Sequence, residues 1–265
     1  MMNHTFVVCA YKESGFLDDT VSRLVNQTVQ SHILISTSTP NESIKAVARR
    51  YGLEVRVNPS GGTSAKDCNF AYAQADTDYV TLAHQDDVYE PEFSEKTLTA
   101  LESAKSPVLA YTDYYELRYA EKGGEGERVE SNRILDIKRK MLRTIDISKN
   151  SRWLRNRVLS IGYPMNCPGS TYVKRRFRSL DFIQDWQNSH DWEVAIRLAS
   201  EKGEFLYIRD LLLGHRIYLE SQTTNTISSG VRYREDFECL RRYWPKPIAA
   251  AILKRYAKSY ESNKL

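Results

Sequence analysis

The sequence predicts an α/β protein built on a doubly wound, mostly parallel twisted sheet that is flanked by helices. The first observation is that short apolar runs alternate with segments of helical period through the first 90 residues. The second is that polar and acidic side chains follow directly after these runs, as at the carboxyl ends of strands that bind ligands in open α/β sheets. The β-α-β alternation favours a parallel sheet with right-handed crossovers.

The elements of the first 90 residues follow from these two periods. Apolar residues at 17, 21, 24 and 25 indicate the first helix, and Gly52 closes the second. The pattern predicts strands at 5–10, 33–35, 54–57 and 79–83, and helices at 16–27, 44–51 and 65–74.

The rest of the chain is less regular. Residues 121–130 are rich in Gly and charge, and we expect a mobile loop there. Residues 133–158 are basic and partly helical, and 233–260 read as amphipathic helices broken at Pro245 and Pro247. The remaining predictions are helices at 91–102 and 191–200, and strands at 108–114, 171–173 and 205–208.

Composition places the chain among ordinary globular proteins, with 265 residues, 41% hydrophobic and 27% charged. Its apolar runs all fall short of the about 18 residues of a membrane-spanning helix. The N-terminus shows neither a basic region nor a small-residue cleavage site, so no secretory signal is expected. Four scattered cysteines without Cys-x-x-Cys spacing fit a reducing compartment. These observations predict a cytoplasmic protein.

Two zones of the chain are basic. Residues 118–157 hold 12 Lys and Arg against 6 Asp and Glu, and residues 223–265 hold 9 against 4. Such zones indicate a polyanionic partner or an anionic membrane, and solvated helical faces are the alternative. The features of nucleic-acid-binding folds are missing, so we expect no nucleic-acid partner. Aromatic residues interspersed with the Lys and Arg residues of 223–265 favour a peripheral contact with the inner face of the plasma membrane. A helix packed on the domain is the alternative.

One predicted strand ends in acids. The run Tyr79–Ala83 leads into His84, Gln85, Asp86 and Asp87. Adjacent carboxylates repel each other unless a cation or a hydrogen-bond network offsets the repulsion. This strand end therefore predicts a metal–diphosphate site, and the alternative is that one of the two acids caps the next helix.

Over roughly residues 4–220, the order of these pieces resembles the inverting family 2 glycosyltransferases of the GT-A fold. The first strand and turn, from Val7 to Glu13, are similar to the family's opening strand, with Tyr11 and Glu13 matching its pattern and Cys9, Ala10 and Lys12 departing from it. The resemblance implies that Ala10, Tyr11 and Glu13 lie against the nucleotide.

The second matching segment follows strand 33–35. Where the family has a carboxylate that contacts the base, this chain has Ser36, Thr37 and Ser38, so the resemblance leaves the base open. The family often has polar nucleotide contacts in the next helix. The matching residues of this chain are Lys66, Asp67 and Asn69.

The third segment is the acidic strand end itself. Asp86 matches the second acid of the family's Asp-x-Asp motif, and His84 replaces the first. The resemblance implies Mn²⁺ or Mg²⁺ held mainly by Asp86, with Asp87 as a weaker ligand, and one or two carboxylates suffice when a diphosphate completes the shell. His84 and Gln85 then face the donor, and Arg216 is a candidate phosphate clamp.

The fourth segment, from His190 to Leu198, is similar to the family's Glu-Asp-Trp-Asp motif, with Asp191 at the catalytic base. A carboxylate in a first helical turn is stabilised by the helix dipole, and a simple N-cap is the alternative. Gly169, His190 and Trp192 fall on the acceptor side of the family's site.

The resemblance therefore implies a metal-dependent transfer of a sugar from a nucleoside diphosphate sugar, UDP-linked by preference, to a hydroxyl of a glycan or lipid-linked glycan. It divides the chain into a GT-A domain at 1–222, with donor and acceptor halves at 1–117 and 118–222, and a basic helical extension at 223–265. A nucleotidyltransferase or metal phosphohydrolase, and a non-catalytic nucleotide-sugar-binding protein, are the alternatives.

Overall fold

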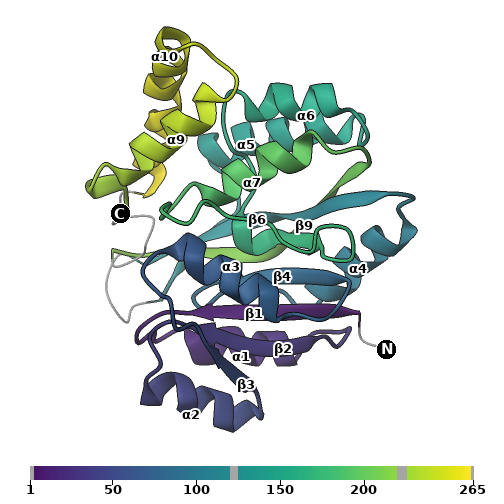
Figure 1. Ribbon diagram of the computed structural model, residues 1–265, viewed down its shortest axis with the longest axis vertical. Coiled ribbons are helices and arrows are strands. Elements are labelled where there is room, and N and C mark those ends of the chain that lie inside the picture. The colour runs from purple at the N-terminus through teal and green to yellow at the C-terminus, as the bar shows by residue number, and fades with distance from the viewer. Residues whose placement is uncertain (1–2, 120–124, 220–225, 264–265) are drawn as a thin grey trace.

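In the computed structural model, which describes residues 3–119, 125–219 and 226–263, the chain forms a mixed nine-stranded sheet with helices on both faces (Figure 1). The strands are β1 His4–Ala10, β2 His32–Thr37, β3 Glu54–Val57, β4 Tyr79–His84, β5 Val88–Tyr89, β6 Pro107–Arg118, β7 Glu127–Val129, β8 Ser170–Val173 and β9 Glu204–Ile217.

The strand order is β3-β2-β1-β4-β8-β6-β9-β5, with β7 paired to β6. Strands β3, β2, β1 and β4 are parallel neighbours, which confirms the doubly wound arrangement predicted for the first 90 residues. Strand β8 is antiparallel to both β4 and β6, while β6 and β9 are parallel. The second half of the chain thus extends the same sheet through one reversed strand.

Four of the helices begin at a residue whose side chain satisfies free backbone groups. Asn41, Thr63, Asn132 and Ser151 accept hydrogen bonds from first-turn N–H groups, and Gly52 ends α2 at φ 64°. The helices are α1 Leu17–Val25, α2 Glu42–Tyr51, α3 Ser64–Gln74, α4 Phe93–Ser103, α5 Arg133–Asp146, α6 Arg152–Leu159, α7 His190–Ala199, α9 Val231–Arg241 and α10 Lys246–Tyr256, with 3-10 turns at Cys167–Gly169 and Ala257–Asn263.

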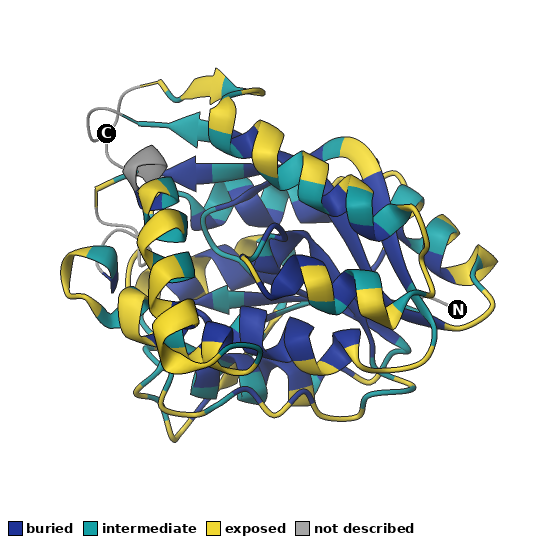
Figure 2. Cartoon of the chain, turned by 90° about the horizontal axis from the view of Figure 1, so that it is seen from above, coloured by how far each residue is buried: buried dark blue, intermediate teal, exposed yellow. Residues whose placement is uncertain are grey.

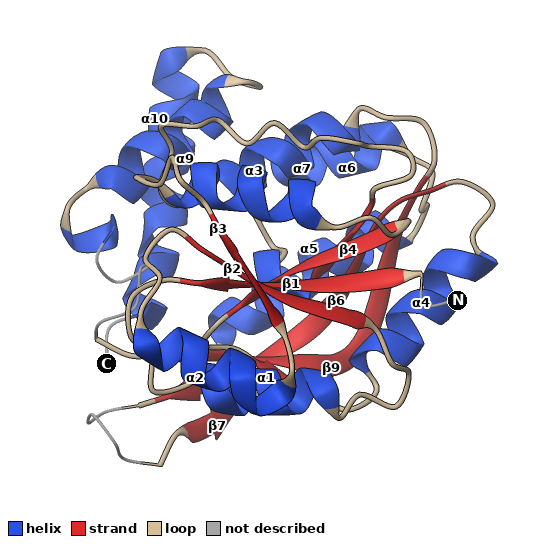
Figure 3. Ribbon diagram, turned by 60° about the horizontal axis from the view of Figure 1, so that its bottom comes forward, coloured by secondary structure: helices blue, strands red, loops and turns tan. Residues whose placement is uncertain are grey.

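Two hydrophobic cores lie on the two faces of the sheet (Figure 3). Successive side chains of a strand point to opposite faces, so Val7 joins one core while Phe6 and Val8 join the other. The first core packs under α3, α6, α7 and α9, and the second under α1, α2 and α4. Figure 2 shows these buried residues enclosed by helices whose outer faces are exposed.

The C-terminal helices pack on the domain. Pro245 lies between α9 and α10, as the sequence predicted for a break there. The apolar side chains of this segment are partly buried against the first core; they are Phe237, Tyr243, Trp244, Ile252, Leu253 and Tyr256. The packed-helix alternative therefore describes α9 and α10. Within the described residues, no helix combines the length and apolar character needed to cross a membrane.

One predicted loop differs from the structure. Of the stretch 121–130, residues 120–124 lie outside the described residues, but Glu127–Val129 forms β7 and pairs antiparallel with β6. The expectation of a loop was wrong for these residues. The length of β6, which continues to Arg118, provides the partner that local composition does not reveal.

Candidate functional site

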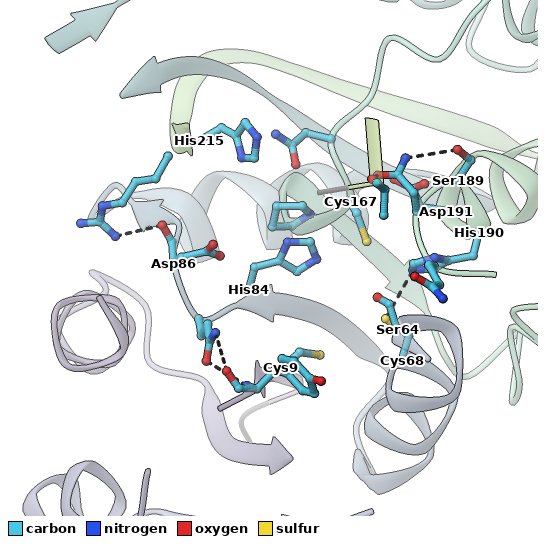
Figure 4. A pocket seen from close by; sticks show the side chains of 18 of the residues that line it. Cys9, Ser64, Cys68, His84, Asp86, Cys167, Ser189, His190, Asp191 and His215 are labelled. Carbon is cyan, nitrogen blue, oxygen red and sulfur yellow. Dashed lines mark hydrogen bonds between the residues drawn. The ribbon is translucent and has the colours of Figure 1, made fainter. Parts of the chain in front are cut away.

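A cleft of about 1120 Å³ opens at the carboxyl ends of β1 and β4 and reaches the N-terminus of α7 (Figure 4). Most of the site residues expected from the sequence line this one cleft, although they come from six separate parts of the chain. They are Ala10, Tyr11, Glu13, Ser36, Asp67, His84, Gln85, Asp86, His190, Asp191, Trp192 and Arg216.

At one end of the cleft, candidate ligand atoms of His84, Asp86 and Asp87 lie within 4.8 Å of one another. Asp86 accepts a hydrogen bond of 2.6 Å from the Tyr218 hydroxyl. Asp87 is buried, and its Oδ1 accepts hydrogen bonds from His215 Nδ1 at 3.0 Å and from the Arg216 backbone N–H at 3.3 Å. Because Glu92 is the N-cap of α4, neither acid caps that helix.

The surroundings shift the pKa values of the two acids in opposite directions. Burial and the neighbouring Asp87 raise the pKa of Asp86. Burial also acts to raise the pKa of Asp87, but the attraction of His215 and its hydrogen bond outweigh burial and lower that pKa below its usual value. In turn Asp87 raises the pKa of His215 against the effect of burial. Asp87 and His215 therefore form a buried ion pair behind Asp86.

This cluster fits a divalent cation. Among the described residues, the Asp87 Oδ2 atom is buried without a hydrogen-bond partner, 3.7 Å from His84 Nδ1. An unpaired buried carboxylate oxygen costs free energy that a cation offsets. His84 and Asp86 line the cleft and Asp87 lies beneath them. A cation here would bind Asp86 and His84 from the cleft side, with Asp87 adding negative charge from below.

Arg216 has most of its donors engaged within the protein. Its guanidinium donates to the Asp86 carbonyl at 3.1 Å, to the Tyr119 hydroxyl at 3.3 Å and to Asp19. It also lies 4.6 Å from the ring of Phe16. Arg216 thus anchors the acidic strand end to α1, which limits the hydrogen bonds that remain for a phosphate.

Gln85 fastens the turn after β1. Its side-chain amide accepts from the Tyr11 N–H at 2.9 Å and donates to the Tyr11 carbonyl at 3.0 Å. The two bonds hold the backbone of Tyr11 against the end of β4, and they leave the Tyr11 side chain half exposed in the cleft. Gln85 therefore acts on this end of the cleft through the position of Tyr11.

A carboxylate from α3 stands beside the second strand. Asp67 accepts hydrogen bonds from the Ser38 hydroxyl at 2.8 Å and the Asn58 amide at 2.7 Å. Asp67 and Ser36 both line the cleft. The segment after β2 lacks an acid of its own, so the tertiary structure supplies one from a different element.

Asp191 lies at the other end of the cleft, in the first turn of α7. Ser189 is the N-cap of this helix, so the N-cap alternative does not describe Asp191. Its Oδ1 accepts from the Trp192 backbone N–H at 2.8 Å. Burial raises the pKa of Asp191 to about 7, although this hydrogen bond and the nearby Arg232 act to lower it. Such a carboxyl group is suited to exchanging a proton near neutral pH.

Two acids of α9 hold the loop that precedes Asp191. Glu235 is 1% exposed, and it accepts from the backbone N–H groups of Gln187, Asn188 and Ser189 at 2.8, 2.8 and 2.9 Å. Asp236 accepts from the hydroxyls of Ser189 and Tyr260. The C-terminal segment thus fixes the start of the helix that carries Asp191.

The structure corrects the expectation for Trp192. Its side chain is 0% exposed, its ring stacks with Tyr163 at a centroid distance of 6.2 Å, and its indole N–H donates to the Leu159 carbonyl at 3.2 Å. A ring packed in this way has no free face for a sugar. The helical period of α7 places Trp192 on the core side, which the motif alone did not reveal.

Other expected site residues do not line the cleft. Asn69 exchanges two hydrogen bonds with the backbone of Phe182, so its amide is used within the fold. Gly169 is buried, and a Cβ there would lie 3.1 Å from Thr112 Oγ1. Thr37 is buried and accepts from the Thr39 N–H. Ser38, Lys66 and Asp87 do not line the cleft either. Ser38 and Asp87 nevertheless hydrogen-bond to Asp67 and His215, which do line it.

His190 is buried beside the cleft. Its Nε2 lies 3.6 Å from Cys68 Sγ, and among the described residues its Nδ1 has no hydrogen-bond partner. Burial lowers the pKa of His190 to about 3, so the ring is neutral. A neutral ring with an unused nitrogen at the cleft wall can accept or donate one hydrogen bond.

Sequence reasoning missed several residues of the Asp191 end. They are Tyr163, Ser189, Ser229, Arg232, Asp236, Tyr256 and Ser259, all of which line the cleft. The only signal available was the amphipathic period of 233–260, which indicates that one side of this segment packs on the protein without saying what that side meets.

Comparisons with known proteins identify the family. The model of Glycosyl transferase family 2 matches residues 5–177, which is more than half of the chain. The chain belongs to this family. It is therefore a transferase, and its fold is similar to the GT-A structures that the resemblance predicted. No curated protein matches the sequence.

Solved structures agree in fold. A crystal structure of S. aureus TarS 1-349 has a TM-score of 0.63 at 12% identity, covering 98% of this chain and 72% of that one. A mannosyltransferase from Pyrobaculum calidifontis, in complex with GDP-Man and Mn²⁺, has a TM-score of 0.64 at 12% identity, covering 97% and 69%. Another TarS structure contains UDP-GlcNAc. At identities this low, the TM-scores show a shared fold and nothing beyond it.

Proposed function

We propose that this family 2 glycosyltransferase is inverting. It moves a sugar from a nucleoside diphosphate sugar to a hydroxyl of a glycan or lipid-linked glycan, with Asp191 as general base. The observation that carries this proposal is the separation of two carboxylate sites within one cleft. A cluster suited to a cation lies at one end, and the carboxyl group of Asp191, with a pKa of about 7, lies at the other.

The chemistry follows from this separation. The acceptor hydroxyl gives its proton to the Asp191 carboxylate while its oxygen forms a bond to the anomeric carbon of the donor. The bond from that carbon to the diphosphate breaks on the opposite side, and its electron pair leaves with the nucleoside diphosphate. Residues that hold the base and the acceptor must therefore lie across the sugar from those that hold the leaving group.

His84 and Asp86 are the residues we assign to a divalent cation, Mn²⁺ or Mg²⁺. Such a cation supplies Lewis-acid stabilisation of the negative charge on the diphosphate. A histidine ligand is more compatible with Mn²⁺ than with Mg²⁺. The orphaned oxygen of Asp87 supports the assignment.

We assign the nucleotide to the walls formed by Ala10, Tyr11, Glu13, Ser36 and Asp67. The half-exposed Tyr11 ring offers a stacking face, and Asp67 offers a carboxylate for base or ribose. UDP- and GDP-sugars are both donors to test, with UDP-sugars first.

The test is release of nucleoside diphosphate from UDP- and GDP-sugars with Mn²⁺. Asp191→Asn should lower turnover by about 10²- to 10⁴-fold, the usual contribution of a general base, with donor affinity unchanged. The exposed Asp185 provides the matched control, because Asp185→Asn alters the same charge nearby without touching the cleft. Wild-type turnover in Asp191→Asn would contradict the assignment.

A peripheral membrane contact through 223–265 is a second, separate proposal. The apolar side of α10 packs on the domain, so the contact would use the exposed basic residues Lys254 and Arg255 of α10 and Lys258 of the 3-10 turn that follows it. Replacing all three by Ser in the full chain should lower co-sedimentation with anionic liposomes several-fold. Unchanged co-sedimentation, or equal binding to neutral liposomes, would reject the electrostatic contact.

A further inference from the structure

The Asp191 end of the cleft contains a buried cation that the proposed transfer does not use. Arg232, the second residue of α9, lines the cleft together with Ser229, Tyr256 and Ser259. Its side chain is only 16% exposed. Helix α9, which carries Arg232, lies beside α7 in Figure 1. The C-terminal segment therefore forms the wall of the cleft at the Asp191 end.

The hydrogen-bonding capacity of Arg232 is incompletely used. Its Nε lies 3.6 Å from the nearest Asp236 oxygen, which is too far for a hydrogen bond. Both Asp236 oxygens already accept from hydroxyl groups, those of Ser189 and Tyr260. Among the described residues, Arg232 Nε is buried and has no hydrogen-bond partner.

Asp236 forms an ion pair with Arg232 at 3.6 Å and balances part of its charge, but it accepts no hydrogen bond from the guanidinium. The guanidinium lies 4.6 Å from the centroid of the Tyr260 ring, a cation–π distance. It also hydrogen-bonds the side chain of Tyr256. When a guanidinium lies over a ring, the N–H groups in its plane can still donate hydrogen bonds. Two of these N–H groups together match the geometry of a phosphate or carboxylate.

Charge favours an anion at this position. A guanidinium removed from water without matching hydrogen bonds costs free energy, and a bound anion would offset that cost. Burial raises the pKa of both Asp191 and Asp236, so the two acids nearest to Arg232 hold protons more readily than exposed acids do. They therefore compete less for its charge.

We propose that Arg232 binds an anionic group of the acceptor, a phosphate or a carboxylate, next to the hydroxyl that Asp191 deprotonates. The acceptor is thus a negatively charged glycan or lipid-linked glycan rather than a neutral one. This inference rests on the proposed function, because only a transferase has an acceptor. Binding of an anion at Arg232, however, can be measured without turnover. The donor diphosphate belongs to the other end of the cleft, at His84 and Asp86.

Binding can be measured without catalysis. We would titrate the full-length protein, saturated with UDP or GDP and Mg²⁺, with three probes in a calorimeter: a methyl glucoside, its 6-phosphate, and the corresponding methyl glucuronide. The wild type should bind the charged probes at least about tenfold more tightly than the neutral one, as expected for a hydrogen-bonded ion pair. The two charged probes distinguish phosphate from carboxylate.

Three variants test the residue. Arg232→Gln should abolish the preference for charged probes while leaving nucleotide affinity unchanged. Arg232→Lys should keep part of it, because the charge remains and the fork is lost. Arg234→Gln is the matched control, since Arg234 is exposed two residues further along the same helix. Circular dichroism verifies that each variant is folded.

Several results would overturn the proposal. The first is that the wild type binds charged and neutral probes equally, or binds neither. The second is that Arg234→Gln loses as much of the preference for charged probes as Arg232→Gln does. The third is that Arg232→Gln binds the nucleotide more weakly. The last would move Arg232 to the diphosphate. If Asp191→Asn kept full turnover, the proposed function would fail while the charge preference persisted, so the two failures are distinguishable.

Discussion

The two ends of the cleft hold carboxyl groups in opposite ways. At the end formed by β4 and β9, Asp87 is paired with His215, and the Asp86 carbonyl is fixed by Arg216. At the α7 end, Asp191 receives a hydrogen bond from the adjacent backbone, and its cationic neighbour Arg232 is not bonded to it. At the first end the carboxylate of Asp87 is held charged by His215, whereas the second end leaves a carboxyl group that gains and loses a proton near neutral pH.

The largest expected effect tests the first end. Asp86→Asn should lower the Mn²⁺-dependent affinity for the donor by at least about 100-fold, because even indirect partners of a metal are worth about 10- to 100-fold. Calorimetric titration of the nucleotide with and without Mn²⁺ measures it. The exposed Asp76 supplies the control variant Asp76→Asn. An unchanged response to Mn²⁺ in Asp86→Asn would mean that the cation lies elsewhere.

The next effect concerns the support of the second end. Glu235→Gln replaces an acceptor of three backbone N–H groups by an amide that faces them with its own donors. Unsatisfied buried donors should lower the free energy of unfolding by about 3 kcal/mol. Urea denaturation measures the loss, and the exposed Glu238 gives the control Glu238→Gln, expected to change it by less than about 0.5 kcal/mol. Equal effects of both variants would contradict the role assigned to Glu235.

The smallest expected effect is a pH dependence that separates the two ends. Because burial raises the pKa of Asp191 to about 7, the base is protonated below that pH, and turnover should fall about tenfold per pH unit there and level off above it. Arg232 lowers this pKa, so Arg232→Gln should shift the acid limb to higher pH, whereas Arg234→Gln should not. A limb near pH 4 would show that burial does not raise the pKa of the base, and a limb that Arg232→Gln leaves in place would show that the titrating group is not beside Arg232.

The same raised pKa has a consequence for stability. The pKa of Asp191 in the folded protein lies above the about 3.9 of an unfolded chain. The folded state therefore binds the proton more tightly, and this contribution to stability is complete below about pH 4 and is lost as the pH rises through about 7.

Local patterns predicted what depends on neighbours in sequence. The strand Glu54–Val57 appeared where its alternation placed it, and the first helices began and ended within a few residues of the expected bounds. The apolar run before His84 and the helical period after Asp191 likewise placed these residues at a strand end and in a first turn. The motif failed at Trp192, because a motif does not say which face of its helix the core covers, whereas the helical period correctly places Trp192 on the buried face with Ala195 and Ala199.

The sequence by itself therefore determined the parallel half of the sheet, the acidic strand end and the position of Asp191, because each follows from apolar period and chain order over a few residues. Only the tertiary structure decided what surrounds them. The reversed strand β8 and the long strand β9 bring His215 to Asp87 across 128 residues, and α9 brings Glu235 to Ser189 across 46. Such contacts depend on strand order and helix packing, which are set by burial over the whole chain rather than by any local pattern.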